Sequence, residues 1–506
     1  IEQHHLMSLS EALAQVHFPK DHISMQKARE RLKFEELFYI QLQILRQMKR
    51  REQNEGFRMP IVGKAFHAQY NVLPFPLTNA QKRVLREIQT DLKSGKQMNR
   101  LLQGDVGSGK TIVALLAALL AVDNGYQACI MAPTEILANQ HYETITKLLK
   151  DSIVSCQLLT GSTTTKQRQS LHEQLRNGEI NILIGTHALI EKEVQFANLG
   201  LCIIDEQHRF GVAQRAKLWE KNIRPPHVLV MTATPIPRTL AMTVYGDLHV
   251  SIIDELPPGR KPVQTLHYNI ERRVTINQFI TQQIELGRQV YVVYPLIQEN
   301  EKLDLQDLQN GYNLLCQTFP NYRISMVHGQ MRGKDKDEQM ARFAKGDTQI
   351  LVATTVIEVG VNVPNASVMI IENAERFGLS QLHQLRGRVG RGADQSYCLL
   401  LTKLEISKDT RKRMDIMVAT NDGFRIAEAD LQLRGPGDLE GTQQSGLPFD
   451  LHIASLTHDG QILELARQTA LAILDADPLL EEMHNRIYKQ RLDHLRQTVV
   501  NWGEIS

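Results

Sequence analysis

Residues 99–122 read NRLLQGDVGSGKTIVALLAALLAV, and this stretch decides the fold. The segment before its glycines is short and apolar at its end, and residues 112–122 are almost wholly apolar. We therefore expect a loop that leads into a buried helix. The pattern G-x-x-x-x-G-K-[ST] in that context predicts a phosphate-binding loop. Its residues are Gly104, Asp105, Val106, Gly107, Ser108, Gly109, Lys110 and Thr111.

Glycines in such a loop let backbone N–H groups crowd around an anion. Lys110 is predicted to reach the β- and γ-phosphates of a nucleotide, and the Thr111 hydroxyl is predicted to hold Mg²⁺. The alternative is a plain glycine-rich turn before a helix, and the apolar flanks favour the nucleotide site. The loop does not define the class of enzyme, because many folds reuse it.

The composition is that of an ordinary globular protein. The chain has 506 residues, of which 42% are hydrophobic and 23% charged. This length predicts about three or four domains. The net charge of +2 does not indicate a nucleic-acid partner, so any such surface has to be local. No apolar run approaches the roughly 18 residues of a membrane span.

Five cysteines are scattered without C-x-x-C spacing. They predict neither a zinc cluster nor a disulfide framework and fit a reducing cytoplasm. Cys129, Cys202 and Cys398 lie in apolar, strand-like runs and are predicted to be buried. The first residues, IEQHH, do not form a signal peptide and contain no initiating Met, so we expect a fragment or a processed product.

Helical stretches alternate with short apolar runs twice, from about residue 75 to 250 and from about 264 to 402. This rhythm predicts two tandem, doubly wound parallel sheets with ligands at the carboxyl ends of their strands. The phosphate loop occurs only in the first copy. Beyond the run at 99–102, the predicted strands are 129–132, 182–185, 201–204, 228–231, 290–294, 324–327, 350–353, 368–371 and 397–401.

Helices flank the two predicted sheets. Residues 25–50 have helical spacing and predict one long helix that packs on another element. Residues 405–434 predict two helices broken at 421–423, and residues after the irregular stretch ending at Gly446 are mostly helical. The expected α/β chain comprises a linker helix region (1–57), a nucleotide-binding domain (58–255), a second such domain (256–404), a helical hairpin with a return loop (405–450) and a C-terminal helical segment (451–506).

An acidic pair, Asp205-Glu206, directly follows the predicted strand 201–204. Such a pair suits metal-assisted hydrolysis, because one carboxylate holds Mg²⁺ and the next orients and deprotonates the attacking water. A solvated acidic turn is the alternative. The position after a buried strand, downstream of the phosphate loop, favours the catalytic interpretation.

The second copy contains QLHQLRGRVGRG at 381–392, in which glycines separate Arg386, Arg388 and Arg391. Guanidinium groups presented from a second domain can neutralise charge that develops on a γ-phosphate. A basic surface loop is an equally simple interpretation of this segment taken alone.

Together, the phosphate loop, DEQH at 205–208 and the arginine segment resemble superfamily 2 helicases and translocases. The resemblance implies two RecA-like domains. Further strings that match motifs of this superfamily are LTNAQ at 77–81 (the adenine-recognising Q motif), MAPTE at 131–135 (motif Ia), GTHA at 185–188 (motif Ic), TATP at 232–235 (motif III) and ATTVIEVGV at 353–361 (motif V).

A closer resemblance is to the RecG family of bacterial branched-DNA translocases. It rests on DEQHRFGV at 205–212, MTATPIPRTLA at 231–241, DGFRIAEADL at 422–431, LRGPGD at 433–438 and GTQQSG at 441–446. In this family the last three form the hairpin and return loop that convert ATP hydrolysis into movement on duplex DNA. The transcription-repair coupling factor shares them, but the GPGD form favours the RecG family. The family's N-terminal wedge domain has no counterpart here, so we expect the chain to start after it.

The resemblance implies ATP and Mg²⁺ as cofactors, with Gln81 and Gly360 joining the phosphate loop in nucleotide binding. Arg386 aligns less well with the arginine-finger positions and is expected to be structural. The implied catalytic residues are Lys110, Asp205 (metal), Glu206 (general base), Gln384 (nucleophilic water or γ-phosphate), and Arg388 and Arg391 (arginine fingers).

The resemblance also implies a DNA path that contacts phosphates, because a motor cannot depend on base sequence. For each threonine on this path, a helix cap is the alternative. For Arg425, an ordinary salt bridge is the alternative. The implied residues are Thr134, Thr160, Thr186, His328 and Thr354, with Arg413, Arg425, Arg434 and Gln444 coupling the hairpin and return loop to the motor.

The implied function is that of an ATP-dependent DNA helicase and double-stranded-DNA translocase. It would remodel stalled replication forks and Holliday junctions in DNA repair and recombination. The resemblance implies a monomer at the nucleoid in the bacterial cytoplasm, with branched DNA and single-stranded-DNA-binding protein as partners. The alternatives are a transcription-coupling translocase, an RNA helicase and a catalytically inactive DNA-binding scaffold. No polymerase-binding module is evident, which counts against the transcription-coupling translocase. The DEAD box is absent and the hairpin would be unexplained, which counts against an RNA helicase. The intact Lys110, Glu206, Arg388 and Arg391 count against an inactive scaffold.

Overall fold

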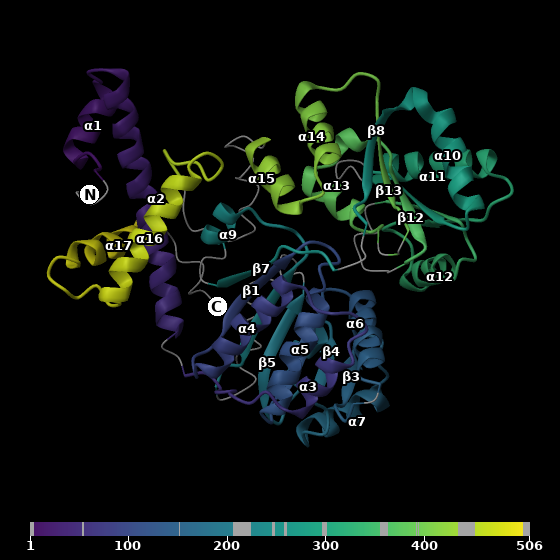
Figure 1. Cartoon of the computed structure of the whole chain (residues 1–506), viewed down its shortest axis with the longest axis horizontal. Coiled ribbons are helices and arrows are strands. Elements are labelled where there is room, and N and C mark those ends of the chain that lie inside the picture. The colour runs from purple at the N-terminus through teal and green to yellow at the C-terminus, as the bar shows by residue number, and fades with distance from the viewer. Residues whose placement is uncertain are drawn as a thin grey trace.

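The computed structural model describes residues 5–52, 55–150, 152–205, 224–244, 248–257, 261–295, 301–354, 363–390, 392, 394–433 and 451–498. Two α/β domains lie one above the other in Figure 1, and a separate group of helices lies at their left. In the residues described, no helix is both long and apolar enough to cross a bilayer.

The first domain has a parallel sheet of seven described strands in the order β3-β4-β2-β5-β6-β1-β7. Leu101 of the phosphate-loop strand pairs with Val230 on one side and Val250 on the other, so this strand lies inside the sheet. The strands are β1 (Asn99–Gly104), β2 (Gln127–Met131), β3 (Cys156–Leu159), β4 (Ile182–Gly185), β5 (Leu199–Asp205), β6 (His227–Thr232) and β7 (His249–Ile253). The surrounding helices are α3 (Lys64–Asn71), α4 (Asn79–Lys93), α5 (Lys110–Asp123), α6 (Glu135–Leu148), α7 (Thr165–Arg176), the 3-10 turn η2 (His187–Ile190) and α9 (Arg238–Val244).

The second domain repeats this plan with six described strands in the order β10-β11-β9-β12-β13-β8. All described pairings in it are parallel. The strands are β8 (Gln264–Asn269), β9 (Gln289–Val293), β10 (Ile324–Val327), β11 (Ile350–Ala353), β12 (Ala366–Ile371) and β13 (Tyr397–Thr402). The surrounding elements are η4 (Ile270–Arg272), α10 (Arg273–Glu285), α11 (Glu301–Thr318), α12 (Gly333–Ala344), η6 (Ala374–Arg376) and α13 (Leu379–Arg386).

The predicted fold class of two tandem, doubly wound parallel sheets is therefore confirmed. Three strands had no predicted counterpart: β3, β7 and β8. Each lies at an edge of its sheet. Their residues are only partly buried, whereas β2 and β5 are buried throughout. An edge strand contacts the core less, so its sequence need not carry the continuous apolar run that marks a central parallel strand; β10, which is also at an edge, does carry a mostly apolar run and was predicted.

The predicted long helix is also confirmed, as α2 (His22–Glu52). It packs against α16 (Gly460–Ala476), with α1 (Leu9–His17) and α17 (Arg486–Thr498) beside them (Figure 1). The Glu36 carboxylate of α2 accepts hydrogen bonds from the backbone N–H groups of residues 452–454. Both Gln41 and Arg467 donate to the carbonyl oxygen of Met242 in α9. The helical group is thereby tied to the first domain.

The predicted hairpin consists of α14 (Lys408–Ala419) and α15 (Gly423–Leu433). The break between them follows from capping, because Asp422 Oδ1 accepts from the backbone N–H groups of Phe424 and Arg425. Figure 1 shows α15 projecting from the second domain toward the first.

The cysteines predicted to be buried, Cys129, Cys202 and Cys398, are all buried. Burial raises the pKa of the Cys398 thiol to about 12. A thiol with so high a pKa forms little thiolate at neutral pH, so Cys398 behaves as a small apolar residue.

The buried side chain of His227 is expected to make the first domain lose stability in acid. This fully buried side chain accepts a hydrogen bond from the Met98 N–H through Nδ1 and donates to the Phe57 carbonyl through Nε2. A second ring proton would face the Met98 N–H, and burial lowers the pKa of His227 below its ordinary value. The folded protein therefore holds the neutral form. The stability that this group contributes is present above the ordinary histidine pKa and is lost as pH falls through it.

We expect the thermal unfolding midpoint to decrease as the pH is lowered from about 7.5 to about 5.5. The uptake of one proton on unfolding changes the free energy of unfolding by at most about 1.4 kcal/mol per pH unit. The change for comparison is His227→Asn, whose side-chain oxygen still accepts from Met98. Its midpoint should depend less on pH than that of the parent chain. An equal acid loss in both proteins would show that His227 is not the group responsible.

Candidate nucleotide site and interdomain cleft

The phosphate loop lies between β1, which ends at Gly104, and α5, which begins at Lys110. Gly109, before the helix, has a φ of +86°, in the left-handed region that glycine adopts readily. Lys110 Nζ donates to the carbonyl oxygens of Gly104 at 2.7 Å and Asp105 at 3.0 Å. The ammonium group is thus held over its own loop at a helix N-terminus, where an anionic phosphate is favoured.

Gln81 lies directly behind this loop. It is 1% exposed, and its side chain forms a capping box with Thr78 at the start of α4. Its Nε2 also donates to the carbonyl oxygen of Ser108 at 2.8 Å. Gln81 therefore supports the loop backbone in this structure, and its contact with adenine stays a prediction.

Asp205 is the last residue of β5 and is 8% exposed. Its Oδ2 accepts a hydrogen bond from Nε2 of His141 in α6 at 2.7 Å. Its predicted partner Glu206 lies outside the described residues.

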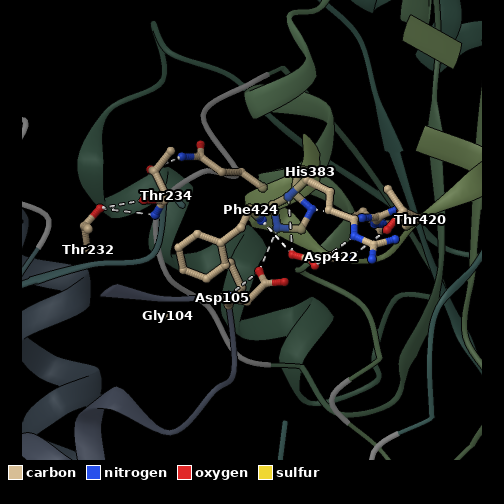
Figure 2. A network of polar contacts seen from close by, with 12 residues as sticks. Gly104, Asp105, Thr232, Thr234, His383, Thr420, Asp422 and Phe424 are labelled. Atoms are coloured by element: carbon tan, nitrogen blue, oxygen red, sulfur yellow. Dashed lines mark hydrogen bonds and ion pairs between the residues drawn. The ribbon is translucent and has the colours of Figure 1, made fainter. Parts of the chain in front are cut away.

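Helix α13 of the second domain crosses to the phosphate loop of the first. His383 Nε2 lies 2.7 Å from Asp105 Oδ1, and Gln384 Nε2 donates to Thr234 Oγ1 at 2.7 Å. Figure 2 shows the His383 and Asp105 side chains facing each other. Burial acts to raise the pKa of the Asp105 carboxyl, but the hydrogen bond from His383, the Val106 N–H and the positive charge of Lys110 together lower it. Asp105 thus stays ionised at neutral pH and can accept from His383.

Two glycines allow the elements at the cleft to touch. A Cβ on Gly387 would lie 2.8 Å from Cβ of Val106 in the phosphate loop. A Cβ on Gly423, at the start of α15, would lie 2.5 Å from both His383 Nε2 and Pro235 Cγ. Four segments therefore meet at one place: the hairpin, α13, the phosphate loop and the TATP segment at 232–235. Their close approach leaves no room for a side chain at Gly387 or Gly423.

Arg386 links α13 to the hairpin. It is 3% exposed, and Nη1 donates to the carbonyl oxygens of Met417 and Thr420 at 2.9 and 2.8 Å. Its Nη2 lies 2.9 Å from Nδ1 of His383. A guanidinium can only donate, so we assign Nδ1 of His383 as the acceptor and place the ring proton on Nε2, toward Asp105. A continuous hydrogen-bonded path thus joins the phosphate loop to the hairpin (Figure 2).

Arg388 follows Gly387, which contacts the phosphate loop, and its side chain is partly buried. Its neighbour Arg391 lies outside the described residues, as do Gly360, Arg434 and Gln444.

The residues predicted to contact DNA lie after equivalent strands of the two sheets. Thr134, Thr160 and Thr186 follow β2, β3 and β4, while His328 and Thr354 follow β10 and β11. The order β3-β4-β2 in one sheet matches β10-β11-β9 in the other, so these positions lie at the carboxyl edges of both. Thr134 caps α6, and the hydroxyl of Thr160 contacts that of Ser162. Buried polar atoms of Thr186, Thr354 and His328 have no hydrogen-bond partner within the described ranges.

The two described hairpin arginines, Arg413 and Arg425, differ in their contacts and exposure. Arg413 of α14 donates to the carbonyl oxygens of Phe377 and Glu375, which holds α14 against the second sheet. The side chain of Arg425 in α15 is 77% exposed and lies 3.6 Å from Asp422. Arg425 is accordingly accessible to a ligand, whereas Arg413 has an internal structural partner.

The second domain has an ion pair at the positions where the first domain has its predicted nucleotide-binding residues. When the two strand orders are aligned, β8 is equivalent to β1 and β12 is equivalent to β5. Helix α10 begins at Arg273, after β8, and Glu372 directly follows β12. Arg273 binds Glu372 through both nitrogens at 2.5 and 2.7 Å. In a bidentate pair of this kind, the two charged groups neutralise each other and fill each other's hydrogen-bonding positions. It leaves the first domain as the candidate nucleotide site.

The residues present fit an Mg²⁺–nucleotide complex. Across the described ranges, no cluster of three or more His, Cys, Asp or Glu side chains could hold a metal by itself. Thr111 and Asp205 offer one hydroxyl and one carboxylate, which suit a hard cation that takes its other ligands from phosphates and water. Gly107 and Gly109 of the loop have positive φ values of 77° and 86°, which fits a loop that turns its backbone toward those phosphates.

Sequence reasoning assigned no role to His141 or to His383. His383 stood inside the arginine segment, and His141 follows Thr134 by seven positions. The only local signal was a histidine in an otherwise apolar helix face, which by itself indicates burial rather than function.

The fold and the cleft define a two-domain protein of the helicase class. The family model "DEAD/DEAH box helicase" matches residues 78–243, and "Helicase conserved C-terminal domain" matches residues 272–393. A third model, "ATP-dependent DNA helicase RecG, domain 3, C-terminal", matches residues 420–506. The chain belongs to the RecG family.

Curated relatives and a solved structure agree with this assignment. The chain is 51% identical to ATP-dependent DNA helicase RecG of Synechocystis over 95% of its length, and 48% identical to that of Bacillus subtilis over 98%. It spans 58% of the first relative and 72% of the second. A structure of RecG bound to a three-way DNA junction superimposes with a TM-score of 0.74 at 44% identity, over 92% of this chain and 60% of that one. Dbp5 of S. cerevisiae, bound to RNA and ADP BeF3, shares the fold at 15% identity, with a TM-score of 0.51 over 80% of this chain and 97% of that one.

Proposed function

We propose that this chain is the motor of an ATP-dependent double-stranded-DNA translocase and helicase that acts on branched DNA in repair and recombination. The observation that carries the proposal is the path from Asp105 through His383 and Arg386 to the carbonyls of the hairpin. A displacement of the phosphate loop can be transmitted to the hairpin through this path, because its ends lie on or directly beside β1 and α14, and these elements are rigid. Membership of the RecG family and the junction-bound RecG structure support DNA as the ligand.

ATP hydrolysis is proposed to occur between the two domains. Lys110 would exchange its loop carbonyls for the β- and γ-phosphates. Asp205 and Thr111 would hold Mg²⁺, which would supply positive charge against the phosphates. Glu206 accepts a proton from the attacking water, and Gln384 places that water. Arg388 and Arg391 stabilise the charge that develops on the γ-phosphate, with Gln81 and Gly360 completing the nucleotide site. Loss of the γ-phosphate then weakens the contact between the domains.

Movement is proposed to arise because both sheets present DNA-binding positions at their carboxyl edges. The buried hydroxyls of Thr186 and Thr354, which have no hydrogen-bond partner among the residues that the structure describes, support this arrangement, since such groups are costly unless a ligand satisfies them. Thr134, Thr160 and His328 complete the path on phosphates. The exposed Arg425, with Arg434 and Gln444, contacts the duplex, and Arg413 holds the hairpin to the second domain.

Family membership further supports a monomer that acts at the nucleoid in the bacterial cytoplasm. In the same proposal, single-stranded-DNA-binding protein is the protein partner that brings it to forks.

The test is ATP turnover by the 506-residue chain with a three-way DNA junction, linear duplex DNA or RNA, each over a salt series. We expect stimulation by both DNAs, strongest with the junction, and a loss of stimulation as salt weakens phosphate contacts. Binding of DNA without turnover would identify a scaffold, and stimulation by RNA alone would identify an RNA helicase. Either result would overturn the proposal.

A further inference from the structure

We propose that His141 is a positioning residue that orients Asp205 and transmits the engagement of DNA to the metal site. This inference rests on the proposed function and deepens it. It assigns a role to a side chain that lies in neither the phosphate loop nor the arginine segment.

His141 occupies a position where an apolar residue would be expected. The buried residues of α6 are Ala138, His141 and Ile145, which form one stripe facing the sheet. His141 and Asp205 are each 8% exposed. A polar ring is costly at such a place unless it is hydrogen-bonded, and the bond to Asp205 Oδ2 at 2.7 Å satisfies it.

The same bond fixes one carboxylate oxygen of the predicted metal ligand. An ionised carboxylate only accepts hydrogen bonds, so Nε2 of His141 carries the proton in this contact. Groups that hydrogen-bond a metal ligand set its orientation, and their removal typically costs about 10- to 100-fold in metal affinity or activity. His141 stands in this relation to Asp205.

Helix α6 joins His141 to the predicted DNA path. Thr134 caps the helix, seven residues before His141, which is about 10 Å along the helix axis. The next residue, Glu135, accepts a hydrogen bond from the Ser162 hydroxyl through Oε2 at 3.0 Å. Ser162 in turn contacts Thr160, so both DNA-facing loops are fastened to the first turn of α6. Because a helix moves as a rigid rod, a shift at this turn also moves His141 and hence the Asp205 carboxylate.

The experiment compares three variants of the 506-residue chain: His141→Ala, His141→Gln and the control His172→Ala. The glutamine amide nitrogen can replace Nε2 as the donor to Asp205. His172 is a matched control because it is also 8% exposed on a buried helix face of the first domain, in α7. Its Nε2 has no hydrogen-bond partner among the residues that the structure describes.

The first readout is nucleotide binding, measured with fluorescent ADP as a function of Mg²⁺ and again in EDTA. For His141→Ala we expect the Mg²⁺ concentration at half-saturation to rise about 10- to 100-fold, with unchanged affinity in EDTA. His141→Gln should recover most of this loss, and His172→Ala should match the parent chain. Equal Mg²⁺ dependence in His141→Ala and the parent would overturn the inference.

The second readout is the ratio of ATP turnover with duplex DNA to turnover without it. This ratio should fall in His141→Ala, while DNA affinity and the thermal midpoint stay near those of His172→Ala. If both alanine variants lose stability and turnover together, or glutamine gives no recovery, His141 is a packing residue only. If the parent chain shows no DNA-stimulated turnover, the proposed function fails, and the Mg²⁺ readout still decides the role of His141.

Discussion

The Arg388→Ala variant is expected to hydrolyse ATP about 10³ to 10⁵ times more slowly than the parent chain in the presence of duplex DNA. Arg388 follows Gly387, whose backbone lies against Val106 of the phosphate loop. A guanidinium at this place can reach the charge that develops on the γ-phosphate, and that charge exists only in the transition state. The measurement is steady-state turnover together with nucleotide affinity, and the loss should fall on kcat rather than on binding.

Arg386→Ala is the control for this variant, since Arg386 lies two residues earlier on the same segment. Arg386 donates to the carbonyl oxygens of Met417 and Thr420 in the hairpin, and each hydrogen bond to a charged group contributes about 1.5–3 kcal/mol. This variant should therefore lower the thermal midpoint and speed hydrogen exchange in α14 and α15, whereas Arg388→Ala should do neither. An Arg388→Ala protein with parental turnover would contradict the arginine-finger assignment.

Lys110→Ala should lower turnover about 10²- to 10³-fold, and it should also weaken ATP binding. The ammonium is held over the loop by two carbonyl oxygens, which is where it meets the phosphates of a bound nucleotide. Its charge acts on the bound nucleotide and acts more strongly on the transition state, so both affinity and rate fall. The measurements are nucleotide affinity by fluorescence titration and turnover with and without DNA.

Lys93→Ala is the matched control for Lys110→Ala, because Lys93 is an exposed lysine in the last turn of α4 in the same domain. It should keep parental turnover, and both variants should bind duplex DNA in the absence of nucleotide. Parental turnover in Lys110→Ala would mean that the glycine-rich loop is not the site of hydrolysis.

Much of the fold could be predicted from the sequence because parallel strands buried on both faces carry continuous apolar runs. Interior strands such as β4 and β11 match their predicted ranges residue for residue, and so does β10, an edge strand whose residues 324–327 are still mostly apolar. The edge strands β3, β7 and β8 could not be found this way, since one neighbour is absent and their residues are only partly buried. The hairpin was predictable because Asp422 and Gly423 are strong helix-boundary residues.

The candidate site divides in the same manner. The phosphate loop, the carboxylate after β5 and the arginine segment are local patterns, so each can be recognised from residue type and spacing. The arginine segment taken alone fits a basic surface loop equally well, and its predicted role came from the resemblance. The sequence therefore predicted which groups bind a nucleotide and in which domain they lie. It also indicated that Arg386 differs from its neighbours, but not what Arg386 binds.

Only the tertiary structure decided how these groups are connected. Asp105 and His383 are separated by 278 positions, and Asp205 and His141 by 64, yet each pair shares one hydrogen bond. Such partners depend on how two sheets and their helices pack, and no local pattern of residues encodes that distance. The physical reason is that a buried polar group must find its partner in space, wherever the chain happens to bring one.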